Sequence, residues 1–310
     1  MFYNIRHQIL YTKFNLLTAG ILNTPPMESV DESHARFSIH TTVCKRDLQL
    51  YLLAIKSFIS FVKGGCIHVH SDGSLEERDQ ELLRSHIPGI CIITPEEAAQ
   101  RAKEHLSPFL QKVRGYYISL ASQLDMILWS KTDYHIKMDC DILTLNSPEF
   151  ILQWLKEGTS PFIISDHITE KKTPPKTLPQ NAHIQAQMEY HQPRIAKGTG
   201  FRFGNTLGLC SGFFGWKNHL KLNEIELFLS SCSNMGFDMS QWGSEQVVTT
   251  WLLTAHDGVR LPMEKYFNLH PPAFHLIDQA TLIHFIGSNR FKNNWYIDKS
   301  KQVIARLGTA

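Results

Sequence analysis

The stretch HIKMDCDILTL, residues 135–145, carries two aspartates one residue apart at the end of an apolar segment. In an extended chain residues i and i+2 point the same way, so Asp139 and Asp141 present their carboxylates on one side. Two carboxylates this close repel each other unless a positive charge lies beside them. A magnesium or manganese ion suits such oxygen ligands and keeps positions for substrate phosphates. The alternative is a plain turn, because aspartate is common after a strand.

Short apolar runs alternate with amphipathic segments on both sides of this stretch. Residues 47–62 repeat apolar side chains at helical spacing, and Pro95 is placed to open a second helix. We expect Ser74 to cap the helix between them, with Glu77 completing a capping box. The runs typical of strands are 36–43, 66–70, 89–94, 133–145 and 161–166.

This alternation predicts an α/β fold in which a mostly parallel central sheet is flanked by helices on both faces, as in Rossmann-like domains. Ligands of such sheets bind at the carboxyl ends of the strands, which is where the paired aspartates fall. With 310 residues, of which 43% are hydrophobic, the chain is long enough to bury a full core. We expect a single main domain over residues 36–310, preceded by an N-terminal arm or helix and linker over residues 1–35.

Charge and cysteine usage exclude several classes of protein. Thirty-one Lys and Arg against 29 Asp and Glu give a net charge of +2, too weak to attract a nucleic-acid backbone, so no nucleic-acid partner is expected. The six cysteines are scattered, without a CxxC pair, which favours a reducing, cytoplasmic setting. Lys13 and Asn15 interrupt the apolar stretch near the N terminus, so no transmembrane segment is expected.

A competing metal site is suggested by His68 and His70, which also point the same way on a strand. A His-x-His pair of this kind serves zinc enzymes. The sequence offers no evident third and fourth ligands nearby, and packing of His68 in the core is the simpler interpretation.

Four further segments occur in a familiar order, namely VHSDGS (69–74), DCD (139–141), CSGFFGW (210–216) and GSEQ (243–246). In this order, over roughly residues 36–292, the chain resembles the nucleotide-sugar glycosyltransferases of the GT-A fold, whose DxD motif corresponds to Asp139–Asp141. Near the C terminus HFIGSNR (284–290) is similar to the His-x-x-Gly-x-x-Lys element of retaining family 8 enzymes. Arg290 stands where that element has lysine, and Phe291 and Lys292 stand where Pro-Trp often follows, so retention or inversion stays open.

The resemblance implies transfer of a sugar from a nucleotide diphosphate sugar, expected to be a UDP-sugar, to a hydroxyl of an unknown glycan, lipid or protein acceptor. It implies Mn²⁺ or Mg²⁺ held by Asp139, Asp141 and His284. Asp141 is expected to face the ion directly and Asp139 to contribute also to donor binding. The other residues that the resemblance assigns to the donor are Thr42, Val43, Asp72, Ser211, Gly212, Gly287 and Arg290.

Three residues are candidates for catalysis on the acceptor side, namely Asp166, Glu245 and Gln246. Ser244 is expected to cap a helix whose first turn holds Glu245, where a carboxylate is also favoured by the helix dipole alone. Asp166 opens a stretch rich in proline and glycine, up to Asn205, which we expect to be an irregular lid over the acceptor. A non-catalytic relative that binds a nucleotide sugar or glycan is the alternative function.

Overall fold

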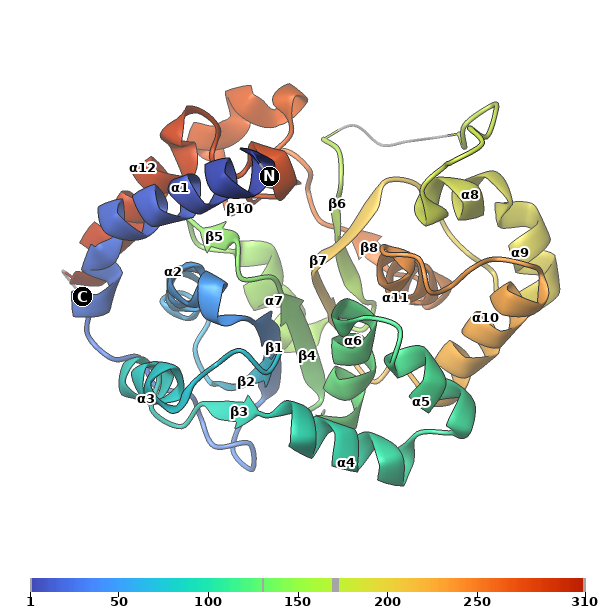
Figure 1. Ribbon diagram of the computed structural model, residues 1–310, viewed down its shortest axis with the longest axis horizontal. Helices are drawn as coiled ribbons and strands as arrows, with labels where there is room; N and C mark the ends of the chain where they lie inside the picture. The colour runs from blue at the N-terminus through green and yellow to red at the C-terminus, as the bar shows by residue number, and fades with distance from the viewer. Residues whose placement is uncertain (1, 130, 169–172, 309–310) are drawn as a thin grey trace.

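The computed structural model describes residues 2–129, 131–168 and 173–308 (Figure 1). Its strands are β1 (Phe37–Val43), β2 (Gly65–Ser71), β3 (Cys91–Ile93), β4 (Tyr134–Met138), β5 (Ile142–Thr144), β6 (Phe162–Ser165), β7 (Leu209–Trp216), β8 (Val259–Arg260), β9 (Tyr266–Asn268) and β10 (Leu282–His284). Its α-helices are α1 (Phe2–Leu17), α2 (Leu48–Ile59), α3 (Glu77–His86), α4 (Pro95–His105), α5 (Pro108–Arg114), α6 (Ile118–Trp129), α7 (Glu149–Glu157), α8 (Ile184–Tyr190), α9 (Gln192–Thr199), α10 (Leu222–Asn234), α11 (Ser244–Ala255) and α12 (Trp295–Gly308).

The described strands form one sheet in the order β3-β2-β1-β4-β7-β6-β9-β10-β5, with β8 beside β6. The pairs β1/β2, β1/β4, β2/β3, β6/β8, β6/β9 and β9/β10 are parallel. Strands β7 and β5 run antiparallel to their neighbours. The prediction of a mostly parallel sheet is therefore confirmed, and the two reversed strands lie on either side of the paired aspartates.

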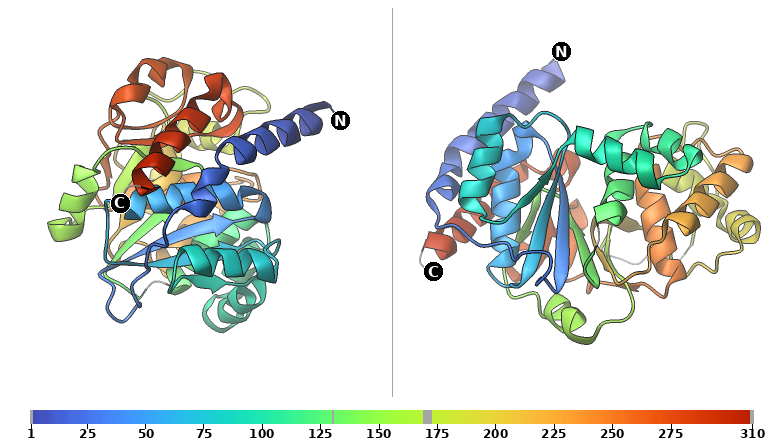
Figure 2. Two further views of the ribbon diagram at one scale, coloured as in Figure 1. Left: turned by 90° about the vertical axis from the view of Figure 1, so that its left-hand side faces the viewer. Right: turned by 90° about the horizontal axis from the view of Figure 1, so that it is seen from below.

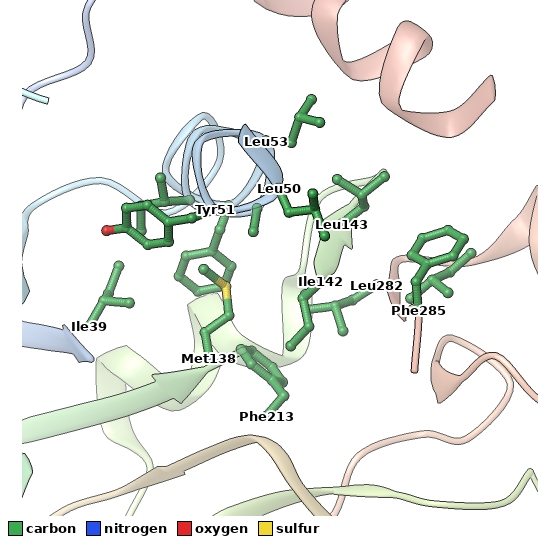
Figure 3. Packing of buried hydrophobic residues seen from close by; sticks show 14 of the residues in the cluster. Ile39, Leu50, Tyr51, Leu53, Met138, Ile142, Leu143, Phe213, Leu282 and Phe285 are labelled. Carbon is green, nitrogen blue, oxygen red and sulfur yellow. The ribbon is translucent and has the colours of Figure 1, made fainter. Parts of the chain in front are cut away.

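Helices cover both faces of the sheet (Figures 1 and 2). Helix α2 packs on β5 and α12, is mostly apolar and is buried along nearly its whole length. Its side chains belong to one large cluster of buried hydrophobic residues, part of which Figure 3 shows. A second cluster forms where α6, α10 and α11 cover β7. The sheet is thus buried on both faces, as its continuous apolar strands require.

The N-terminal stretch forms helix α1, which contacts the first turn of α12 (Figure 1). Tyr11 and Phe14 are buried, and Phe14 packs on Tyr296 of α12 at 4.5 Å between ring centroids. The division into residues 1–35 and 36–310 stays a prediction. No helix in the described ranges is both long and apolar enough to span a bilayer.

Two expected helix caps are wrong. Ser74 does not cap α3, because its hydroxyl is engaged by Asp72, and the loop runs on until Glu76 and Asp79 form the capping box instead. Ser244 does not cap α11 either, since Gly243 holds the cap position at φ +97°. There a glycine accepts a left-handed backbone that a serine would resist.

The stretch from Asp166 to Asn205 is more regular than expected. It contains α8 and α9, and Pro193 lies in the first turn of α9, where a missing N–H costs no helical hydrogen bond. Residues 169–172 of the predicted lid lie outside the described residues.

Candidate metal and donor site

Asp139, Asp141 and His284 meet at the ends of neighbouring strands. Asp139 follows β4, Asp141 precedes β5, and His284 ends β10, opposite Ile142 of β5. One ligand atom from each residue lies within 4.8 Å of the others. The Nε2 atom of His284 is 3.0 Å from Asp141 Oδ1 and 3.4 Å from Asp139 Oδ2. In an octahedral shell with bonds of about 2.1 Å, adjacent ligand atoms are about 3 Å apart, so these spacings suit a small divalent ion.

Buried apolar residues hold each of these three side chains in place. Met138, Ile142, Phe213 and Phe285 all belong to the large core cluster and pack close to one another, as Figure 3 shows. They are the chain neighbours of Asp139, Asp141, Gly212 and His284. Because alternate residues of an extended chain face opposite ways, the core contact of one residue aims the next at the site.

A bulge in β7 makes room for the site. The register between β6 and β7 shifts so that Ile163 pairs with Phe214, whereas Ile164 pairs with Cys210. Gly212 lies in the displaced part, and its carbonyl accepts a hydrogen bond from the Asp139 amide at 2.9 Å. A Cβ at Gly212 would lie 2.1 Å from His284 Cε1 and 3.0 Å from Asp139 Oδ2. Only glycine therefore fits against the three ligands here, and bulges often occur beside functional sites.

Two cations hold the outer oxygens of the carboxylates. Lys137 Nζ pairs with Asp139 Oδ1 and donates a 2.7 Å hydrogen bond to the Ser211 carbonyl. Arg290 pairs with Asp141 Oδ2. Burial would raise the pKa of Asp141, but Arg290 and His284 lower it well below its usual range. Each aspartate thus keeps its other oxygen turned toward His284.

Asn268 orients the imidazole of His284. Its Oδ1 lies 3.0 Å from His284 Nδ1, and its Nδ2 donates a 2.8 Å hydrogen bond to Asp166 Oδ1. Nδ1 of His284 is therefore occupied, and Nε2 is the atom aimed at the carboxylates. Burial alone would lower the pKa of His284, yet the charge of Asp141 raises it to about 10. A metal ion would take the place of the Nε2 proton in this arrangement.

Asp166 lies in the same hydrogen-bonded network as His284, and its predicted role on the acceptor side stays a prediction. His270 Nε2 is 3.2 Å from Asp166 Oδ1, and His167 Nε2 is 3.4 Å from Oδ2. Burial opposes ionisation, but hydrogen bonds from His270 and Asn268 lower the pKa of Asp166. Asp166 is therefore an ionised carboxylate that is held in a fixed orientation.

The predicted contacts to the nucleotide lie at the ends of β1 and β2. Val43 is buried in the core, so only its backbone faces the strand end, and Thr42 is half-buried beside it. The Asp72 carboxylate accepts hydrogen bonds from the Ser74 amide at 2.9 Å and the Ser74 hydroxyl at 2.6 Å. This turn is the simpler role that aspartate has after a strand.

Four more of the predicted donor residues lie around the three ligands or just after them. Ser211 is buried, and Gly287 is exposed with φ +47°, a backbone that favours glycine. Arg290 does not point away as a free cation, because Asp141 and the Tyr11 hydroxyl both engage it. Its predicted contact with a diphosphate stays a prediction.

Glu245 and Gln246 both have partners within the protein. The Glu245 carboxylate accepts hydrogen bonds from the Tyr117 hydroxyl at 2.5 Å and the Gly243 amide at 2.9 Å. Gln246 Nε2 donates to Gln185 Oε1 of α8 at 2.5 Å. These contacts join α11 to the residue that precedes α6 and to α8, and the catalytic roles of both residues stay predictions.

Lys137, Asn268 and His270 were missed from the sequence. Lys137 lies two residues before Asp139, so the spacing i, i+2 on the strand already placed both on one face. Asn268 and His270 carry no such signal, because they reach the site only when β9 pairs with β10, which sets Asn268 beside His284.

Known structures share this architecture. No protein-family model matches the sequence, and a search of curated proteins found no match. The galactosyltransferase LgtC, solved with donor and acceptor sugar analogues, superposes with a TM-score of 0.51 at 12% identity, covering 88% of this chain and 97% of that one. The bifunctional glycosyltransferase WbbM gives a TM-score of 0.52 at 11% identity, over 92% of this chain and 53% of its own. An active-site variant of LgtC gives 0.50 at 11% identity. The chain therefore has the GT-A fold that these glycosyltransferases share.

Proposed function

We propose that this protein is a metal-dependent glycosyltransferase that uses a nucleotide diphosphate sugar, with a UDP-sugar as the expected donor. The observation that carries the proposal is the convergence of Asp139 Oδ2 and Asp141 Oδ1 on His284 Nε2, at 3.4 and 3.0 Å. Their position at strand ends of a GT-A sheet supports it, since ligands of α/β sheets bind there.

The residues of the site fit Mn²⁺ or Mg²⁺. Two carboxylates and one imidazole are ligands that manganese accepts, and the glycine at position 212 leaves the space that three converging ligands need. When bound, such an ion neutralises the charge that develops on a departing diphosphate. We propose Asp139, Asp141 and His284 as its ligands.

Four other residues around the site would orient these ligands and the acceptor. Lys137 and Arg290 fix the two carboxylates through their outer oxygens, and Asn268 fixes the imidazole. We propose that Asp166 accepts a hydrogen bond from the acceptor hydroxyl, because it is ionised and joined through Asn268 to His284. Orientation of reacting groups by such a fixed network is a major part of enzymatic rate enhancement.

A non-catalytic nucleotide-sugar-binding protein is the second candidate. It is favoured by the ion pairs that already neutralise both aspartates from within the chain, Lys137 with Asp139 and Arg290 with Asp141. Such pairs can hold the site together without turnover.

Incubation with a panel of UDP- and GDP-sugars, with and without Mn²⁺, separates the two candidates. Release of nucleoside diphosphate that needs Mn²⁺, and that His284→Ala removes, is expected for the transferase. Gln153→Ala is a matched control, since Gln153 is exposed on α7 and bonded only to Glu157 of the same helix. Tight donor binding without release for any sugar would identify the binding protein, and absence of both binding and release would refute the proposal.

A further inference from the structure

A second cluster of metal-ligand side chains lies where the N-terminal linker crosses the edge of the sheet. Cys66 and His68 are two residues apart on β2, so both face the same side, and Glu32 of the linker reaches them. One ligand atom of each lies within 4.8 Å of the others. These residues lie in the amino-terminal half of β2, whereas Asp139 follows the carboxyl end of β4. The cluster is therefore separate from the donor site.

Two buried polar atoms of this cluster have no hydrogen-bond partner among the residues that the structure describes. His68 is only 3% exposed, and its Nδ1 has no partner, while its Nε2 lies 3.8 Å from Glu32 Oε1, beyond hydrogen-bonding distance. Glu32 Oε1 is also buried without a partner. Lys131 Nζ, at 3.2 Å, holds only the other oxygen of Glu32. Unpaired buried polar atoms are costly and rare, so this pair of residues needs a further partner.

We propose that Glu32, Cys66 and His68 bind a zinc ion. Sulfur, imidazole and carboxylate together are ligands that zinc takes up in tetrahedral sites, and the sulfur selects zinc over magnesium or manganese. Cys91 of β3 pairs in register with His68 and is exposed, so it is available for the fourth position. The expectation that the His68–His70 pair lacks further ligands nearby is thus wrong for His68, because Glu32 arrives from a distant part of the chain.

The protonation of the cluster is consistent with such a site. Burial lowers the pKa of His68, so its imidazole is neutral and keeps a lone pair for a metal. Burial raises the pKa of Cys66 to about 12, and zinc would displace the thiol proton as it binds. The ion would fasten the linker to β2 and so stabilise the folded chain. This inference does not depend on the proposed transferase activity.

Titration of the full-length protein with Co²⁺, used as a spectroscopic substitute for zinc, tests the proposal. We expect a near-ultraviolet sulfur-to-cobalt charge-transfer band at one equivalent, which the oxygen and nitrogen ligands of the donor site cannot produce. The band should lose intensity in Cys66→Ser and vanish in the double variant Cys66→Ser/Cys91→Ser, and it should persist in Cys232→Ser, which changes a buried thiol on α10, and in Asp139→Asn. Absence of the band in the wild type, or its full intensity in Cys66→Ser, would overturn the proposal.

Thermal unfolding with Zn²⁺ gives a second readout. A free zinc concentration of 100 times the dissociation constant should raise the unfolding midpoint by roughly 4 °C. Glu32→Gln provides a variant that is expected to fold, because Glu32 lies in a partly exposed linker, and it should lose most of this shift. An equal shift in Glu32→Gln and the wild type would remove Glu32 from the site and refute the three-ligand assignment.

Discussion

Substitution of Gly212 by alanine tests the geometry of the candidate metal centre most directly. The added methyl carbon would lie 2.1 Å from His284 Cε1, whereas unbonded carbon atoms are in contact at about 3.5 Å. The His284 ring would therefore have to move away by more than about 1 Å, whereas metal–ligand distances tolerate deviations of only about 0.2 Å. Since Gly212 does not have a positive φ, the effect comes from the methyl group alone.

We expect Gly212→Ala to lose Mn²⁺ affinity and to lower Mn²⁺-dependent diphosphate release by about 100-fold, the usual result of a 1 Å misplacement. The matched control is Gly215→Ala on the same strand. Its methyl group would lie 2.2 Å from the Phe162 ring, away from the three ligands, so it should cost comparable stability. Free Mn²⁺ measured by electron paramagnetic resonance gives the affinity, and urea unfolding gives the stability. Wild-type Mn²⁺ affinity in Gly212→Ala, or an equal loss in Gly215→Ala, would refute the assigned geometry.

Three further outcomes are expected. Asp141→Asn should lower the free energy of unfolding by roughly 3–5 kcal/mol in urea titrations, because it leaves the buried charge of Arg290 unpaired. The double variant with Arg290→Met should recover part of this loss, and an unchanged unfolding midpoint in Asp141→Asn would contradict the pairing. Tyr11→Phe removes the hydroxyl that accepts a hydrogen bond from Arg290, and it should lower the free energy of unfolding by about 1 kcal/mol. It should also weaken donor binding several-fold in equilibrium titrations, and unchanged donor affinity would show that α1 does not influence the site. Burial lowers the pKa of His70 and His135 to about 3, so as the pH falls from 6.5 toward 3 the unfolded chain binds protons that the folded chain does not. Between pH 7 and 5.5 each histidine should lower the free energy of unfolding by roughly 1 kcal/mol in urea titrations, and His70→Asn should reduce this dependence on pH. An unfolding midpoint independent of pH would argue against neutral buried histidines.

Local patterns in the sequence were sufficient for the segments that form β1 to β6, although residues 133–145 were expected to be one strand, and for the position of the acidic pair. Strands β7, β8 and β9 were not predicted. Asp139 and Asp141 were expected on one face of an extended segment, but residues 140 and 141 form a turn between β4 and β5, and both carboxylates nevertheless face His284. The alternation of apolar strands and amphipathic helices predicted the mostly parallel sheet. The helix caps failed at Ser74 and Ser244, because the Ser74 hydroxyl donates to the Asp72 carboxylate and the Ser244 hydroxyl donates to the backbone carbonyl of Met239.

The sequence by itself determined the segments that form β1 to β6 and where the acidic pair stands. Only the tertiary structure decided which side chains surround them: Asn268 beside His284, Arg290 against Asp141 and Tyr11, and Glu32 against His68. The partners in these contacts are between 16 and 279 residues apart in the chain. In the last contact, Glu32 lies in the linker and His68 lies on β2. Local periodicity carries no information about such contacts, because strand order and crossover connections set them after the core has packed.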